Sequence, residues 1–271
     1  MKKVFLLLIL PFFFLTCKKD KGSAKQLFLS KVYEDGLLTK EYIYSSDKKP
    51  LRRNSYSTGT GQSVPAGFRL YEYSAAGLLE TVTDFSKTNQ FISKYKLQYN
   101  INKKPVRMDE LAGDNTLQFY YLYDYGPEGY LAKFMLFNAS TNKKTFEGYY
   151  TNNAQGKITK VIRYSFSSNN PVKYDSTTFN FNTNKLPAYW DYFEALPAIA
   201  LPKGDRYFFD MSCDNLFYYY VDAPPIKTNV TFSGKEYNKE GYLVKQQITY
   251  TTESFGPIVV VNNEMTYEYV K

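Results

Sequence analysis

Residues 237–250 read YNKEGYLVKQQITY: a tyrosine, a polar turn that contains Gly241, and then apolar residues that alternate with polar ones. Alternation with a period of two is typical of a β-strand that buries one face. Glycine adopts the left-handed backbone conformation of a tight hairpin turn without steric cost. Similar phrases begin at Tyr33, YEDGLLTKEYIY, and at Tyr73, YSAAGLLETVTDF. Each phrase therefore predicts a turn followed by a strand.

The phrase recurs along the chain with a regular spacing. The aligned turn positions are Gly36, Lys48, Gly77, Lys103, Gly129, Gly156, Lys185 and Gly241. From Gly77 onward the steps between them are 26, 26, 27, 29 and 56 residues. The last step is close to two periods, so a further copy is expected near residue 213. A period of this size indicates a supersecondary unit repeated in series.

The text between two turns predicts two strands. After Gly77 the chain reads LLETVTDF, then polar SKTNQ, then FISKYKLQY, which is a strand, a loop and a returning strand. One hairpin buries too little apolar surface to be stable alone, so hairpins are added in series. The predicted fold is all-β, an antiparallel meander of repeated β-hairpins with a period of about 26–29 residues and on the order of fourteen to sixteen strands. The sheet is expected to be curled or barrel-like, because closure protects its edges.

The aromatic content supports strands. Aromatic residues make up 18% of the chain, with 28 tyrosines and 21 phenylalanines, and such side chains pack well across a pleated surface. Residues 117–125, LQFYYLYDY, place Leu117, Phe119, Tyr121 and Tyr123 on one face and Tyr120 and Leu122 on the other. This strand is therefore expected to be central and apolar on both faces.

One segment interrupts the period, an irregular insertion at about 187–225. Its stretch AYWDYFEAL is expected to form a short helix, and prolines limit regular structure after it. Tyr189, Trp190, Asp191 and Tyr192 combine aromatic rings with polar groups, so they are candidate ligand-binding residues for a glycan. The alternative is that these aromatic side chains cap the core of the sheet. We expect a single β-hairpin-repeat domain over 27–271, with this insertion inside it.

The N-terminus predicts export and lipidation. The chain begins MKKVFLLLILPFFFLTCKKDKG, in which two lysines precede an apolar run too short to span a bilayer. FLTC resembles a bacterial lipobox, which implies a lipoprotein signal peptide over 1–16 and lipidation of Cys17. Residues 17–26 are then a lipidated cysteine and a flexible tether. The alternative is a soluble exported protein with an incidental cysteine.

The composition excludes several kinds of site. The chain has no histidine, which removes histidine-based catalytic triads and histidine metal sites. With Cys17 acylated, Cys213 has no intramolecular partner and is expected to be a small buried residue. The formal net charge is +8 without a block of like charges, so nucleic acid is not an expected partner. No cofactor, metal or catalytic residue is predicted.

Two acidic groups are the remaining candidates for chemistry. Asp191 with Glu194 has the residue types of a carboxylate pair for glycoside hydrolysis, and so do Asp205, Asp210 and Asp214. Neither group matches a known spacing, and the calcium-loop pattern is absent. A histidine-free carboxylate hydrolase is therefore the least favoured function, and we expect that the protein is not an enzyme.

The phrase at 123–134, YDYGPEGYLAKF, resembles the YD repeats of Rhs-type bacterial surface proteins. The whole chain is similar to Bacteroidetes-type lipoproteins that carry degenerate YD-like β-hairpin repeats, and SCDNL at 212–216 resembles a segment that often precedes their last repeats. The resemblance departs from true YD repeats in its period and in the frequent lysine at the glycine position. It implies a β-repeat fold and a location at the cell surface, and it implies no activity.

Together these observations predict an outer-membrane lipoprotein at the cell surface, attached to the membrane through Cys17. It is expected to act as a binding or interaction module for a glycan or for an envelope or host protein. The alternative is a structural component of the envelope that faces the periplasm.

Overall fold

The computed structural model describes residues 26–154, 156, 158–166, 171–181, 213–220, 226–253 and 256–271. These residues form sixteen β-strands and no helix. The strands are β1 (Phe28–Glu34), β2 (Leu37–Tyr44), β3 (Pro50–Ser57), β4 (Val64–Tyr73), β5 (Leu79–Ser86), β6 (Phe91–Tyr99), β7 (Pro105–Ala112), β8 (Leu117–Tyr125), β9 (Leu131–Asn138), β10 (Lys143–Asn152), β11 (Ile158–Ser165), β12 (Val172–Phe181), β13 (Cys213–Tyr220), β14 (Ile226–Tyr237), β15 (Leu243–Glu253) and β16 (Val259–Val270).

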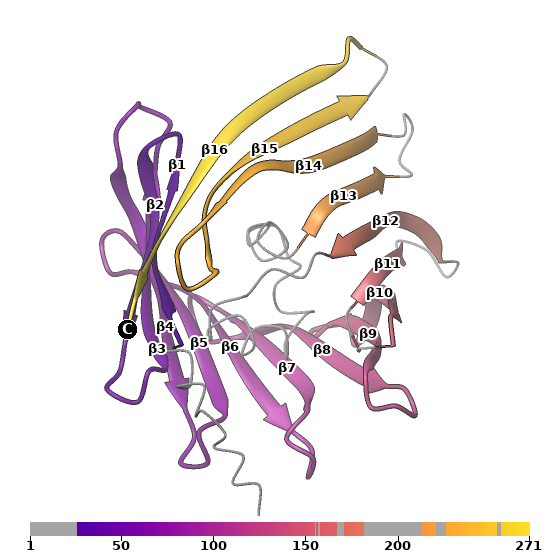
Figure 1. Cartoon of the computed structure of the whole chain (residues 1–271). Helices are drawn as coiled ribbons and strands as arrows, with labels where there is room; N and C mark the ends of the chain where they lie inside the picture. Colours follow the sequence, from indigo (N-terminus) through magenta and orange to yellow (C-terminus); the bar gives the residue numbers. More distant parts are fainter. Residues whose placement is uncertain are drawn as a thin grey trace, which may run out of the picture.

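The strands form one antiparallel meander, as the repeat predicts. Each strand pairs with its neighbours in sequence, and β1 also pairs with β16, so the strand order closes on itself (Figure 1). The closing ladder runs from Phe28 opposite Val270 to Glu34 opposite Met265. The first part of β16 therefore lies beyond the reach of β1. The predicted all-β, curled fold is confirmed.

The turns carry the predicted backbone conformation. A positive φ is found at Gly36, Lys48, Gly77, Lys103, Gly129, Gly156 and Gly241, all of them aligned turn positions, whereas Lys185 lies outside the described residues. Lysine adopts φ of 64° at Lys48 and 58° at Lys103, although this region favours glycine. In the turns from Lys48 onward, the amide of the positive-φ residue donates to the carbonyl three residues earlier. A repeated phrase therefore encodes a repeated turn.

Two details of the repeat prediction are wrong. Gly36 joins β1 to β2, whereas the turns at Lys48, Gly77 and Gly241 join an even-numbered strand to the next odd one, so Gly36 lies at the opposite end of the sheet. We call the end with the recurring turns the repeat end and the other the far end. Cys213 begins β13, which pairs with β12 and β14, so the chain there is a strand and not a further turn. The long step to Gly241 spans the insertion and one hairpin.

The tyrosine of the repeated phrase has its own structural role. At the repeat end, the hydroxyl of the last tyrosine of an even strand donates to the first backbone carbonyls of the strand before it. The pairs are Tyr44 to Leu29 at 2.6 Å, Tyr73 to Pro50 at 2.9 Å, Tyr99 to Leu79 at 2.6 Å, Tyr125 to Pro105 at 2.7 Å and Tyr269 to Leu243 at 2.5 Å. In β10 the side-chain amide of Asn152 donates to Leu131 at 2.8 Å instead. We call this bond the tyrosine latch, because it joins the open ends of two strands whose turn is at the far end.

The hydrophobic core lies on one face of the sheet. Residues directly opposite on neighbouring strands share a face, and Leu97, Met108 and Tyr121 continue one another in this way and are all buried. β8 is buried on this face at Tyr121 and Tyr123, whereas Leu117 is 40% exposed and Tyr120 and Leu122 are half-buried. β8 is therefore buried on the core face, as predicted, but its other face is only half-buried, which is less burial than the sequence predicts.

In the part of the chain that the structure describes, no helix has the length and apolar character needed to cross a membrane.

Candidate functional site

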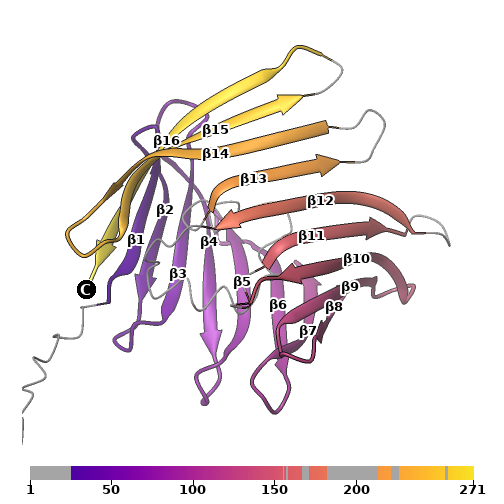
Figure 2. The ribbon, with the colours of Figure 1, turned by 45° about the vertical axis from the view of Figure 1, so that its right-hand side comes forward.

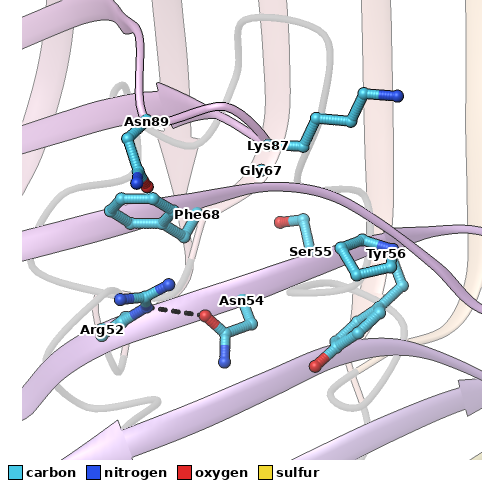
Figure 3. Close-up of a pocket in the computed structure, with 9 residues that line it drawn as sticks. Arg52, Asn54, Ser55, Tyr56, Gly67, Phe68, Lys87 and Asn89 are labelled. Atoms are coloured by element: carbon cyan, nitrogen blue, oxygen red, sulfur yellow. Dashed lines mark hydrogen bonds between the residues drawn. The ribbon is translucent and has the colours of Figure 1, made fainter.

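The predicted ligand-binding residues Tyr189, Trp190, Asp191 and Tyr192 lie outside the described residues, as do Cys17, the signal peptide and the expected helix. Within the described residues, a pocket of about 220 Å³ lies on β3, β4 and the turn after β5 (Figure 3). Its lining includes Arg52, Asn54, Tyr56, Phe68, Lys87 and Asn89. It lies toward the far end of the sheet, because Tyr56, Lys87 and Asn89 are next to turns at that end.

Arg52 is the fixed cation of this pocket. Alternation along β3 puts Arg52 and Asn54 on one face, and Asn54 lies directly opposite Phe68 on β4. The Arg52 guanidinium carbon is 3.8 Å from the centre of the Phe68 ring, and its Nε donates to Asn54 Oδ1 at 2.7 Å (Figure 3). A cation at this distance from an aromatic face is attracted to it. The stack and the hydrogen bond together hold the guanidinium in one orientation.

A carboxylate on β2 orders the polar side of the pocket. Glu41 lies opposite Asn54, and its Oε2 accepts a hydrogen bond from Asn54 Nδ2 at 3.0 Å and one from the Tyr56 hydroxyl at 3.3 Å. Burial, together with the charge of Glu41, raises the pKa of Tyr56 above its ordinary value. The phenol therefore stays protonated at neutral pH and remains a donor. Asn54 is thereby fixed from both sides, with its oxygen toward Arg52 and its nitrogen toward Glu41.

Stacked rings form the wall behind Arg52. Phe68 and Phe85 lie opposite one another on β4 and β5, and their ring centres are 4.9 Å apart with an interplanar angle of 13°. The strands approach closely beside them, since a Cβ built at Gly67 would lie 2.4 Å from the carbonyl oxygen of Phe85. The wall is rigid because each ring is held by a cross-strand neighbour.

Arg52 differs from three other arginines of the sheet in its partner. Arg69, Arg107 and Arg163 each donate from Nε to an aspartate oxygen at 2.7 Å, in Asp84, Asp109 and Asp175 respectively. Arg52 donates instead to a neutral amide, and among the described residues no carboxylate lies within ion-pair distance of it. Its terminal N–H groups can therefore bind a negatively charged group that enters the pocket.

A similar arrangement recurs at β7–β9, with an aspartate in place of Asn54. Arg107 lies 4.5 Å from the ring centre of Tyr120, and Tyr120 stacks on Phe137 with ring centres 4.9 Å apart. Asp109 occupies the position that Asn54 has in the pocket, opposite the stacked ring. The Arg107 charge is thus neutralised within the protein, so this second stack is a natural comparison for the first.

The sequence did not single out these residues. Arg52 and Asn54 follow the turn position Lys48 in the phrase YSSDKKPLRRNSY, which predicts a turn and a strand and no binding site. One sequence signal does mark them: after a KKP turn, PLRRN and PVRMD both have an arginine followed two residues later by Asn or Asp. The aromatic partner is much harder to find, because it depends on the register between two strands.

For chemistry of other kinds, the described residues contain no group of three or more His, Cys, Asp or Glu side chains arranged to hold a metal ion.

No protein-family model matches this chain, and no curated protein matches it either. Among solved structures, it is similar to a porin-like protein from Bacteroides uniformis, with 10% identity over 85% of this chain and 89% of the other and a TM-score of 0.52. A porin-like protein from Bacteroides vulgatus has 9% identity, coverage of 89% and 98%, and a TM-score of 0.42. The Photorhabdus luminescens Tc holotoxin pore has 14% identity, coverage of 82% and 9%, and a TM-score of 0.34. At these identities the likeness concerns the fold, and the first comparison shows that the protein shares its antiparallel β architecture with the Bacteroides uniformis porin-like protein.

Proposed function

We propose that this protein is a lipid-anchored module of the outer membrane that binds an anionic glycan in the pocket on β3 and β4. Arg52 carries the proposal, because its guanidinium is fixed by Phe68 and Asn54 and has no carboxylate partner in the part of the chain that the structure describes. Such a guanidinium binds carboxylate or phosphate groups through two parallel hydrogen bonds. Lys87, which also lines the pocket, adds to the positive charge, and Glu41 is a carboxylate that accepts hydrogen bonds from Asn54 and Tyr56.

The remaining pocket groups suit a sugar. Asn54 and Asn89 carry amides, Ser55 and Tyr56 carry hydroxyls, and these groups match the hydroxyls of a carbohydrate. The volume of about 220 Å³ lies below the range of about 300–1,000 Å³ for drug-sized ligands. We therefore expect the pocket to hold one acidic sugar unit of a longer chain, with the neighbouring units outside it.

The position of the pocket supports a ligand outside the membrane. β1 begins at Phe28 at the repeat end, so a tether from a lipidated Cys17 would join the sheet at that end. The pocket lies toward the far end, about one strand length away. An anchor at one end and a pocket toward the other suit a displayed binder.

The direct test is binding of the full chain, in detergent, to polymers that differ in charge. Polygalacturonate offers carboxylates, and dextran of similar length is the neutral control. We expect binding to polygalacturonate by biolayer interferometry, and a 10- to 100-fold loss in Arg52→Ala, since a hydrogen bond to a charged group contributes about 1.5–3 kcal/mol. Arg107→Ala is the matched control and should bind like the unmodified chain. Equal binding of dextran, or equal affinity in Arg52→Ala, would contradict the proposal.

A further inference from the structure

The first part of β16 is an exposed apolar strand. Val259, Val260 and Val261 have exposed fractions of 53%, 54% and 46%, and Ile258, which precedes the strand, is 63% exposed. Residues 256–263 contain no charged side chain. Figures 1 and 2 show this stretch in the hairpin with β15, with no strand drawn on its outer side. Contiguous apolar surface of this kind marks an interaction site more often than isolated apolar residues do.

The backbone of this stretch is open on one edge. The pairing of β1 with β16 stops at Glu34 opposite Met265. One position further along, Asp35 makes two hydrogen bonds to the backbone of Glu264. The Asp35 amide donates to the Glu264 carbonyl at 2.8 Å, and the Glu264 amide donates to Asp35 Oδ1 at 2.7 Å. The Glu264 backbone groups therefore face the β1 side.

The direction of the other backbone groups follows from alternation. Pairing of β16 with β15 runs without a register shift from Val259 to Thr266. Backbone N–H and C=O groups alternate sides along a strand, so those of Asn262 and Val260 face the same open side as those of Glu264. Those of Val261 and Val259 face β15. Two N–H and two C=O groups are thus presented along an edge that no described strand covers.

Natural sheets usually protect such an edge with lysine, proline, a bulge or a covering segment. Here the side chains along the edge are valine and asparagine, and Pro257 precedes the strand. We propose that β16 adds an extended segment of a partner protein to the sheet at Val259–Asn263. Recognition by strand addition takes its affinity from backbone hydrogen bonds and its specificity from side chains on alternate faces.

The side chains define the chemistry of the partner segment. Val259 and Val261 lie on the face that Met265 and Tyr267 continue, and Val260 lies on the other. The partner segment is therefore extended, uncharged and apolar on both faces, and about five residues long. A second copy of this chain would have to pair its own Val259–Asn263 with the same five residues, and the test below distinguishes that outcome. This inference does not depend on the pocket or its ligand.

The test uses a capped, uncharged eight-residue peptide rich in valine, isoleucine and threonine, labelled for fluorescence anisotropy. A second peptide has the same sequence with N-methyl groups on alternate amides, which removes donors from one edge. We expect the first peptide to bind the full chain and the N-methylated one to bind at least tenfold more weakly. Hydrogen exchange at the Val260 and Asn262 amides should slow on binding.

Val260→Pro removes an outward amide without breaking the ladder to β15, and it should lower peptide affinity at least tenfold. Val260→Lys places a charge on the edge. This variant replaces Val260→Pro in the binding test if the proline lowers the stability of the protein. Ile43→Lys is the control, because Ile43 is 44% exposed but β2 is paired on both sides. Equal binding of the two peptides, or unchanged affinity in both Val260 variants, would overturn the proposal. Dimerisation in light scattering that Val260→Pro abolishes would assign the edge to a second copy instead.

Discussion

The hydroxyl of Tyr125, at the end of β8, donates a hydrogen bond of 2.7 Å to the carbonyl oxygen of Pro105, at the start of β7. The same latch joins Tyr99 to Leu79 at 2.6 Å. The repeated tyrosine is therefore both an apolar ring against the core and a donor that closes the open end of a hairpin.

Removing one hydroxyl should destabilise the fold modestly. Tyr99→Phe and Tyr125→Phe leave a carbonyl unpaired, and each should lower the free energy of unfolding by about 0.5–1.5 kcal/mol in urea denaturation. Tyr33→Phe is the control, because the Tyr33 hydroxyl bonds to Glu268 at the surface. If the control loses as much as the latch variants, the latch has no special role.

Replacing a positive-φ lysine by glycine at a turn position should stabilise the fold. Lys103 has φ of 58°, where glycine pays no steric cost. Lys103→Gly should raise the free energy of unfolding by up to about 1 kcal/mol, because relief of about 1–2 kcal/mol of strain exceeds the added flexibility of the unfolded chain.

The reverse change at Gly156 should be harmful. Gly156 has φ of 78°, and a Cβ there would lie 2.3 Å from the Tyr130 ring. Gly156→Ala should lower the thermal midpoint by several degrees, since strain of about 1–3 kcal/mol is added. This account of the turns would be contradicted if Lys103→Gly and Gly156→Ala shifted the thermal midpoint in the same direction.

Glu110 should make stability depend on pH. Burial is the main cause that raises its pKa above the ordinary value, nearby Asp84 adds to the rise, and the hydrogen bond from Tyr121 opposes it. A carboxyl with a raised pKa in the folded state favours folding at low pH, and this contribution is lost as the pH rises through the folded-state value.

Glu110→Gln should therefore be more stable than the unmodified chain at pH 7, and this difference should shrink toward pH 4. Urea denaturation at both pH values measures it, with exposed Glu80→Gln as the control. A constant difference at both pH values would show that Glu110 does not titrate in this way.

On intact cells, the protein should be accessible to an added protease. The predicted surface lipoprotein should be degraded by a protease too large to cross the outer membrane, as followed by immunoblot beside a periplasmic control. Protection until lysis would favour the alternative, a structural component that faces the periplasm.

Much of this fold can be predicted from the sequence, because the repeated phrase marks the residues that form the turns. Positive φ at Lys48 and Lys103 follows from their alignment with glycines. The location of Gly36 at the far end cannot be predicted in this way, because the end at which a turn lies depends on how many strands precede it.

The pocket is less accessible to sequence reasoning for a different physical reason. Arg52 meets Phe68 because the β3–β4 register sets Asn54 opposite Phe68, and that ladder contains a register shift between Ser55 and Tyr56. A one-residue shift in pairing places a side chain on the other face of the sheet. The open edge at Val260 likewise depends on where β1 ends.

The most direct measurement replaces Asn54, which bonds Arg52, by the residue type that Arg107 has as its partner. Asn54→Asp should pair Arg52 with a carboxylate, as Asp109 pairs Arg107 at 2.7 Å, and so remove its charge from the pocket. We predict at least a tenfold loss of affinity for polygalacturonate in this variant. Its thermal midpoint should fall, because the change also replaces the amide that donates to Glu41 by a second carboxylate. Asp109→Asn should leave that affinity at least as high as in the unmodified chain. Unchanged binding in Asn54→Asp would contradict the central claim that the unpaired Arg52 guanidinium holds the ligand.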